Sequence, residues 1–394
     1  MYHSLAALST AVQAQAAEQV ASANPLVSIA AFLLMLFILV VVHELGHFVT
    51  AVWMGIRVEE FGIGYPPRAA TLFERNGVKY TLNWLPLGGF VRFATNEGER
   101  PDSLYGVGSL QQATPWRKIL VMVAGPLMNL LLAIAIFAGL FMFMGVPQPT
   151  GTQTLGTIYP NTPAAQAGFQ AGDLLISLDG RPVSDSNVVV EAGRNNSGRP
   201  ISAQVRRDGQ VLDLTVTPGR WTTSSGEVVE AGFGFGYSPT TDYAQAGPIE
   251  AIGAGAAYTW NLLGQMLSGL AALPGAIAGM FTPNNDGNSP IGPVGIARVT
   301  GEVLQQEGGL LAFFNLTAVL SLNLFLLNLL PIPALDGSHI VFSLIEWLRG
   351  GKKLPPEREA IVHALGFAGL MGLMLVITVS DVIKAFSGTP ILGN

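Results

Sequence analysis

The chain has 394 residues, of which 49% are hydrophobic and only 12% are charged, against about 25% charged residues in soluble domains. This balance indicates a membrane protein, and the absence of cysteine excludes disulfides and thiolate metal sites. The net charge of -6 comes without a basic stripe, which argues against a nucleic-acid partner.

Apolar stretches long enough to cross a bilayer, whose core needs about 20 residues of helix, predict a polytopic α-helical membrane protein with about four transmembrane helices. The predicted spans are residues 25–55, 117–145, 310–337 and 360–386. Residues 1–24 lack the basic start and apolar core of a signal peptide, so we expect an N-terminal extension there, and a tail at 387–394.

A further apolar stretch, 251–280, carries no charge but is rich in glycine and polar residues. We expect it to lie at the membrane interface or against the helix bundle, within a linker of residues 221–309. Lysine and arginine gather in the predicted loops 56–116 and 338–359, and the positive-inside rule places both loops in the cytoplasm. The region between the second and third spans is then extracytoplasmic.

The first span contains His43, Glu44 and His47 in the spacing H-E-x-x-H. On a helix the two histidines lie one turn apart on one face, so both can bind one zinc ion, and the glutamate can take a proton from water at the metal. The alternative is a chance match, expected about once in a hundred chains of this length. Because ionisable residues inside a membrane are costly, the metal site is favoured, with one zinc per chain.

Zinc needs a third protein ligand and an open position for water. Glu59 and Glu60 follow too closely to fold back easily, whereas the third span runs in the same direction as the first and ends near Asp336. His43 lies roughly 27 Å of helix beyond the start of its span, on the cytoplasmic side, so Asp336 arrives at a similar depth. The alternative is that Asp336 is only a turn residue after two helix-ending prolines.

Several segments carry a family resemblance: HELGHF (43–48), PLGGFV (86–91), AGPLMN (124–129), GPVGIA (292–297) and SLNLFLLNLLPIPALDG (321–337). With these segments the chain resembles the site-2 proteases, and within them the bacterial regulator-of-sigma-E protease type. The resemblance implies an intramembrane zinc endopeptidase in the cytoplasmic (inner) membrane of a bacterium. Its substrate would be a single-span membrane protein already cut outside the lipid bilayer, an anti-sigma factor or a signal-peptide remnant.

The same resemblance implies a set of site residues. The zinc ligands would be His43, His47 and Asp336, with Glu44 as the base and the site near the cytoplasmic side. The residues that would shape the substrate site are Asn328, Pro331 and Pro333.

Residues 155–183 resemble part of a PDZ domain, with turns at Gly172-Asp173 and Asp179-Gly180 and a later hairpin at Asp208-Gly209. We therefore expect an inserted extracytoplasmic PDZ domain at 150–220, with an extra strand at 232–239. PDZ domains bind peptides by strand addition, which favours substrate recognition or size-gating over a spacer or plug. An unrelated small β-rich domain is the alternative fold.

The loop 56–116 is expected to hold a membrane-associated β-hairpin, because residues 78–84 alternate between apolar and polar and 58–65 offers a partner strand. Its free edge could pair with an unwound substrate; the alternative is an ordinary cytoplasmic hairpin. The candidate substrate-binding residues on this edge are Thr81, Leu82, Asn83 and Trp84.

Two other functions fit parts of the pattern. A non-catalytic scaffold that displays a PDZ domain would not need Glu44. A zinc transporter or metal sensor would place ionisable residues along a path through several helices, whereas here they lie at one depth. The complete H-E-x-x-H with Asp336 favours the protease.

Overall fold

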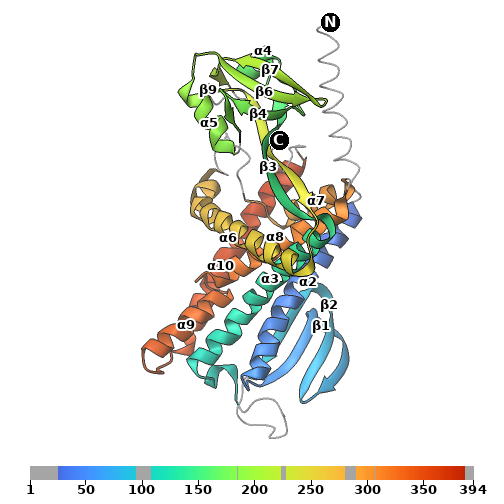
Figure 1. The fold of residues 1–394 in the computed structure, drawn as a ribbon. Helices are drawn as coiled ribbons and strands as arrows, with labels where there is room; N and C mark the ends of the chain where they lie inside the picture. Colours follow the sequence, from blue (N-terminus) through green and yellow to red (C-terminus); the bar gives the residue numbers. More distant parts are fainter. Residues whose placement is uncertain are drawn as a thin grey trace. The chain divides into compact units, whose positions relative to one another are not determined.

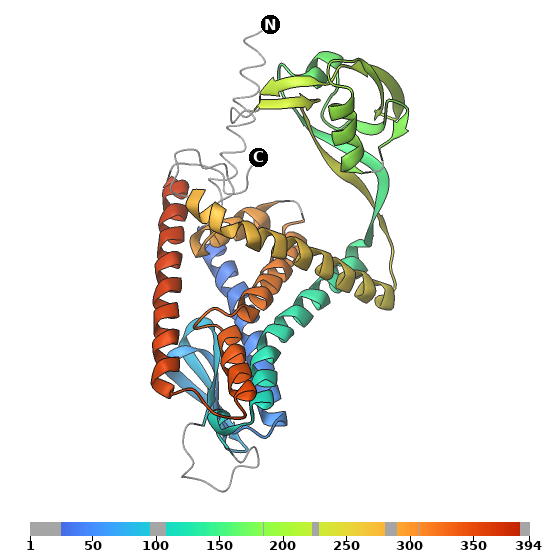
Figure 2. The ribbon, with the colours of Figure 1, turned by 90° about the vertical axis from the view of Figure 1, so that its left-hand side faces the viewer.

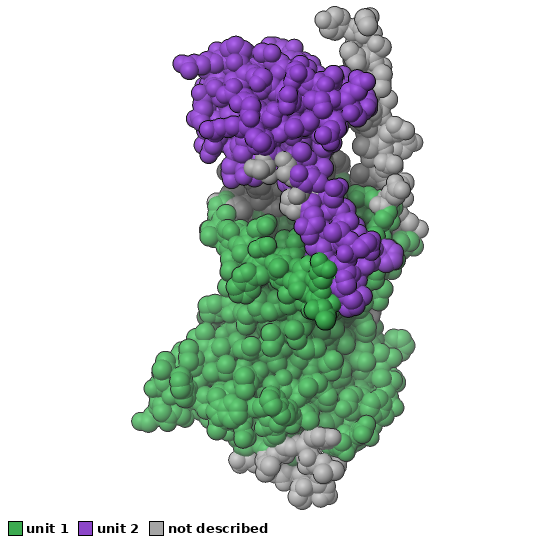
Figure 3. Space-filling view, viewed as in Figure 1, with its two compact units in different colours: residues 1–140, 249–394 green, residues 141–248 purple. Residues whose placement is uncertain are grey.

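The computed structural model describes residues 25–94, 108–183, 185–222, 228–279, 290–306 and 308–386. The chain forms two compact units, residues 1–140 with 249–394, and residues 141–248 (Figure 3). The predicted N-terminal extension and C-terminal tail lie outside the described residues.

Four of the described helices are long and apolar enough to cross a membrane. They are α2 (Pro25–Trp53), α3 (Pro115–Met144), α8 (Gly309–Leu329) and α10 (Pro356–Phe386). Each of the predicted spans therefore corresponds to a helix of suitable length and hydropathy.

The third predicted span ends earlier than expected. α8 ends at Leu329, and Asp336 begins a separate helix, α9 (Asp336–Leu348). The predicted span 310–337 is therefore not one continuous helix: the two prolines, which are expected to break a helix, and a positive φ of 75° at Ala334 turn the chain between α8 and α9. Most of the predicted loop 338–359 is helical, because α9 runs to Leu348 and α10 begins at Pro356.

The predicted linker 221–309 also contains regular structure. α6 (Pro248–Gly279) covers the ambiguous apolar stretch and is not among the described helices apolar enough to span. α7 (Pro293–Gln305), which was not predicted, packs against α2, α8 and α10. A short 3-10 helix, η1 (Leu110–Gln112), precedes α3.

Two long strands, β1 (Val58–Arg75) and β2 (Val78–Phe93), form a sheet beside α2 (Figures 1 and 2). The connecting turn is Asn76-Gly77, where both residues have positive φ. Each strand bends, so that residues 60–63 of β1 pair with 89–92 and also with 79–82 of β2. The later part of β1 pairs with the same early part of β2.

This pairing corrects the expected position of the free edge. Residues 79–82 have paired segments on both sides, so the backbone around Thr81 cannot take a further strand. The segment 89–93 is paired on one side only among the described residues. The prediction missed this because the β1 segment after residue 65 was not recognised as a strand.

Residues 141–248 form a six-stranded sheet in the order β10-β3-β4-β6-β7, with β5 beside β4, and a separate hairpin of β8 and β9. The strands are β3 (Val146–Ile158), β4 (Leu174–Leu178), β5 (Arg181–Pro182), β6 (Ile201–Arg207), β7 (Gln210–Val216), β8 (Gly219–Thr222), β9 (Val228–Gly232) and β10 (Phe235–Ala244). The helices are α4 (Pro163–Ala167) and α5 (Ser186–Asn195).

The predicted turns of this unit occur as expected, since Asp179-Gly180 and Asp208-Gly209 have positive φ and connect neighbouring strands. Its boundary differs from the predicted 150–220. β10 pairs with β3, and Phe233 and Phe235 are buried in the core of the unit. The strand expected at 232–239 is therefore an integral part of this unit, not of a linker.

Candidate metal centre

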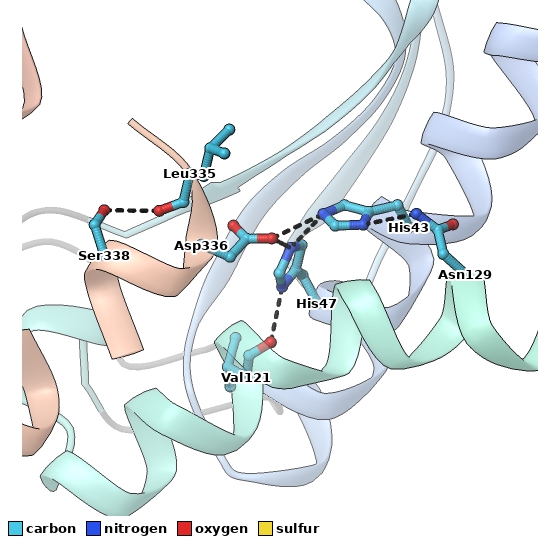
Figure 4. A network of polar contacts seen from close by, with 7 residues as sticks. All are labelled: His43, His47, Val121, Asn129, Leu335, Asp336 and Ser338. Carbon is cyan, nitrogen blue, oxygen red and sulfur yellow. Dashed lines mark hydrogen bonds and ion pairs between the residues drawn. The ribbon is translucent and has the colours of Figure 1, made fainter. Parts of the chain in front are cut away.

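Two histidines of α2 face the interior of the first unit. His43 and His47 are 8% and 5% exposed, and their Nε2 atoms lie 3.1 Å apart (Figure 4). The helix runs without a break from Pro25 to Trp53, and one helical turn separates the two residues. Both imidazoles therefore point to the same place.

Asp336 brings a carboxylate to that place from the first turn of α9. Its Oδ2 lies 3.0 Å from His43 Nε2 and 3.3 Å from His47 Nε2 (Figure 4). The three ligand atoms lie within 4.8 Å of one another, and no other such group of metal-binding side chains occurs in the described part of the chain.

This donor set fits zinc. Two ligands bound about 2.0–2.1 Å from a tetrahedral zinc lie roughly 3.3 Å apart, which is close to the separations observed here. Oδ2 of Asp336 is also buried without a hydrogen-bond partner among the described residues, as expected of an atom that serves as a ligand. Two histidines and one carboxylate leave the fourth position open.

The loop before Asp336 is held by α10. The His363 Nδ1 atom accepts a hydrogen bond of 3.1 Å from the backbone N–H of Ala334. Gly366 lies against Pro333, where any Cβ would collide. On the other side, the Ser338 hydroxyl donates to the Leu335 carbonyl at 2.7 Å. These contacts determine where the carboxylate of Asp336 lies.

α3 lies behind both histidines. The Val121 carbonyl accepts a hydrogen bond of 2.7 Å from Nδ1 of His47, and the amide of Asn129 lies 3.2 Å from Nδ1 of His43. A Cβ at Gly125 would collide with both imidazole rings, so only glycine allows this approach. Sequence reasoning did not assign these residues, although all but Val121 lie in the AGPLMN segment.

Glu44 lies next to the free edge of the β1–β2 sheet. It is partly exposed, its Cγ is 3.7 Å from where a Cβ of Gly89 would be, and the Val91 backbone N–H is within hydrogen-bonding reach of its carboxylate. The Glu44 side chain therefore lies beside the strand edge 89–93, on the residue that follows His43.

The other predicted residues fall into two groups. Thr81 and Asn83 are buried: the Thr81 hydroxyl donates to Glu60 at 2.7 Å, and the Asn83 amide donates to the Gly64 carbonyl at 3.1 Å. Leu82 and Trp84 are exposed. Thr81 and Asn83 therefore stabilise the sheet, and of these four residues only Leu82 and Trp84 offer their side chains to a ligand.

Asn328 and the two prolines precede the third ligand along the chain. Asn328 is partly exposed in the last turn of α8, and Pro331 and Pro333 follow it in the connecting loop. Glu60, considered above as an alternative ligand, instead forms ion pairs with Arg68 and Arg92 at 2.7 and 2.9 Å.

Comparison with known proteins agrees with this geometry. Residues 31–373 match the model of Peptidase family M50. The chain is 30% identical to the regulator of sigma-W protease RasP of Bacillus subtilis (strain 168), over 91% of this chain and 99% of that protein. It is 30% identical to the zinc metalloprotease RasP of Geobacillus kaustophilus (strain HTA426), over 91% and 98%.

A protein of Rhizobium meliloti (strain 1021) that bears the name of a zinc metalloprotease is 32% identical, over 89% of this chain and 94% of its own length. The match therefore extends through the metal centre and the candidate membrane helices, and is not limited to H-E-x-x-H. The chain belongs to Peptidase family M50, the site-2 proteases, and is a multi-pass zinc metalloprotease.

Proposed function

We propose that this protein is an intramembrane endopeptidase that cuts transmembrane segments of single-span membrane proteins. The observation that carries the proposal is the meeting of His43, His47 and Asp336 at one point, with the two histidines inside a helix long and apolar enough to span a membrane. Burying such groups in a membrane is costly unless they have a function.

The chain's own residues suggest a division of roles. His43, His47 and Asp336 would hold one zinc ion, which when bound polarises the scissile carbonyl and makes water a stronger acid. Glu44 would take the proton from that water and pass it to the leaving amine. Asn328, partly exposed beside the loop that leads to Asp336, would hold the substrate backbone or stabilise the oxyanion.

The free edge of β2 at residues 89–93 offers a way to hold the substrate. Peptide bonds in a transmembrane helix are shielded by their own hydrogen bonds, and an unpaired amide in the membrane costs several kcal/mol. A substrate that unwinds beside this edge would regain backbone partners by strand addition. Glu44 lies beside the same edge, which would bring the extended peptide bond to the base.

The distribution of lysine and arginine supports one membrane topology. The basic loop between α2 and α3 and the basic turn after α9 would be cytoplasmic, and residues 141–248 extracytoplasmic, in the inner membrane of a bacterium. Residues 141–248 would form a PDZ-like domain, and its groove is lined by residues of α5, by Trp221 and by residues within the segment 229–237. We assign to it the recognition or size-gating of substrates already cut outside the membrane.

The test is a cleavage assay with zinc analysis on purified protein. Glu44→Gln is expected to keep zinc and lose cleavage, because the glutamate acts as a base and does not bind the metal. Asp336→Asn is expected to weaken zinc binding and also to lose cleavage. Glu59→Gln, a change in a nearby glutamate outside the site, is the matched control. Turnover at the wild-type rate in Glu44→Gln would refute the mechanism.

A further inference from the structure

Asn129 places a polar side chain deep among the apolar residues of α3. The residue is fully buried, and its amide lies 3.2 Å from Nδ1 of His43 (Figure 4). Its backbone carbonyl accepts a hydrogen bond of 2.7 Å from the Ser321 hydroxyl of α8. A buried amide is costly unless it is paired, so its position beside His43 calls for an explanation.

The chemistry of histidine supplies one. A neutral imidazole binds a metal through one nitrogen and carries its proton on the other, and the hydrogen bond made by the second nitrogen selects the tautomer. At His47 the selection is unambiguous, because the Val121 carbonyl can only accept, and it accepts from Nδ1 at 2.7 Å. Nε2 of His47 is then free to bind a metal.

At His43 the neighbour is an amide, which has both a donor and an acceptor. The oxygen and nitrogen ends of an amide have nearly the same shape, so turning it places Oδ1 against Nδ1 of His43 in the same space. Oδ1 of Asn129 has no hydrogen-bond partner among the described residues, so this turn breaks no bond made by that oxygen.

We propose that Asn129 is a positioning residue for His43. Its amide oxygen accepts a hydrogen bond from Nδ1–H of His43, which leaves the lone pair of Nε2 on the side of Asp336 Oδ2, 3.0 Å away, so that the two atoms would hold a zinc ion together. Asn129 and Val121 thus perform the same task for the two histidines, and both belong to α3. The inference rests on the ligand set of the proposed function.

The experiment measures zinc affinity on the purified full-length protein by competition with a chelator. The variants are Asn129→Leu, which keeps the size but cannot accept a hydrogen bond, and Asn129→Asp, which can. His43→Ala tests the ligand itself. Asn315→Leu removes an exposed asparagine from α8 and is the matched control. The unfolding temperature of each variant is measured with and without excess zinc, because a ligand that binds the folded state raises it.

We expect Asn129→Leu to weaken zinc binding about 10–100-fold, with a smaller zinc-induced rise in unfolding temperature and an unchanged unfolding temperature in chelator. Asn129→Asp should restore the affinity, and Asn315→Leu should leave it unchanged. If Asn129→Leu does not fold, Asn129→Ala takes its place, and the same loss of zinc affinity is expected of it.

Wild-type zinc affinity in Asn129→Leu, or equal losses in the Leu and Asp variants, would overturn the positioning role. An unchanged zinc affinity in His43→Ala would instead refute the ligand set of the proposed function. The two failures are therefore distinguishable.

Discussion

Lys118 Nζ donates a hydrogen bond of 2.7 Å to Glu346 Oε2, and this ion pair joins α3 to α9. Both side chains are largely shielded, at 13% and 10% exposed. Lys118 lies one turn before Val121, the partner of His47, and Glu346 lies on the helix that Asp336 begins. α3 therefore contacts both helices that carry the candidate ligands, α2 through His47 and α9 through Glu346.

This ion pair predicts a role in holding Asp336 in place. Lys118→Met leaves the Glu346 carboxylate buried without its partner, which destabilises the α3–α9 contact. We expect zinc affinity to fall about tenfold, in the range found for groups that support metal ligands. The charge swap Lys118→Glu with Glu346→Lys should recover most of the loss. The control is Arg298→Met, which removes an ion pair within α7, and equal losses in that variant would contradict a specific role.

The free edge at 89–93 predicts where proline blocks proteolysis. The N–H of Ala94 donates to the carbonyl of Arg57, the residue before β1. Successive N–H groups of a strand point to opposite sides, so the N–H groups of Val91 and Phe93 face away from β1. Val91→Pro and Phe93→Pro should each reduce cleavage severely while zinc content stays normal, because they remove outward donors only. Val91 also contacts Glu44, so its replacement by proline could act on the glutamate as well as on the strand edge. Phe93→Pro tests the edge without that contact.

Two comparisons make that result interpretable. Val91→Ala keeps the backbone donor and should cleave at close to the wild-type rate. Thr81→Pro breaks pairing inside the sheet and should lower the unfolding temperature, since residues 79–82 are paired on both sides. Normal cleavage by both edge proline variants would mean that the substrate is held elsewhere.

The second unit can be removed at a defined point. Val146 and Ala244 are paired neighbours in β3 and β10, so a short glycine-serine linker can replace residues 147–243 without stretching the chain. We expect the shortened protein to bind zinc normally and to cut substrates whose outer domain is still intact. Measurement of cleavage for long and pre-trimmed substrates separates this outcome from a general loss of activity, which would argue against gating.

A groove variant distinguishes gating by size from recognition of a peptide. Val190 of α5 lines the groove and is 42% exposed. Val190→Glu introduces a charge into the groove with little effect on the core of the unit. A purely steric gate predicts unchanged substrate selection in this variant, whereas peptide recognition predicts weaker cleavage of the natural substrate with unchanged cleavage of a pre-trimmed one.

A buried ion pair of the second unit predicts how its stability changes with pH. Asp173 is buried and accepts hydrogen bonds from Arg207 at 2.7 Å and from the Gln170 N–H at 2.9 Å. Burial by itself raises the pKa of Asp173, but these hydrogen bonds outweigh it, so the pKa lies below its usual value. The folded state therefore binds fewer protons than the unfolded state, and the stabilisation is present above pH of about 4 and lost as the pH falls through the folded pKa.

The measurement is urea unfolding of residues 141–248 from pH 7 down to pH 2.5. We expect Asp173→Asn to cost about 2 kcal/mol of unfolding free energy at pH 7, and the difference from wild type to shrink at low pH. Ser177→Ala, a change at an exposed hydrogen bond, is the control. Parallel pH curves for wild type and Asp173→Asn would show that this carboxylate does not carry the effect.

Local features of the chain were readable from the sequence. The membrane helices follow from runs of apolar residues, because a bilayer selects length and hydropathy without regard to distant partners. The turns at Asn76-Gly77, Asp179-Gly180 and Asp208-Gly209 follow from residue types that tolerate positive φ, although the first was not recognised. The one-turn spacing of His43 and His47 is likewise a property of a single helix.

The surroundings of the metal site depend on contacts between residues far apart in the chain. Val121 and Asn129 reach the histidines only because Gly125 lets α3 approach α2, and Lys118 meets Glu346 from the far end of α9. The two-sided pairing of residues 79–82 likewise depends on how β1 bends. Hydropathy and periodicity report which face of an element is buried but not which neighbour covers it, because that choice depends on the packing of several helices and strands together.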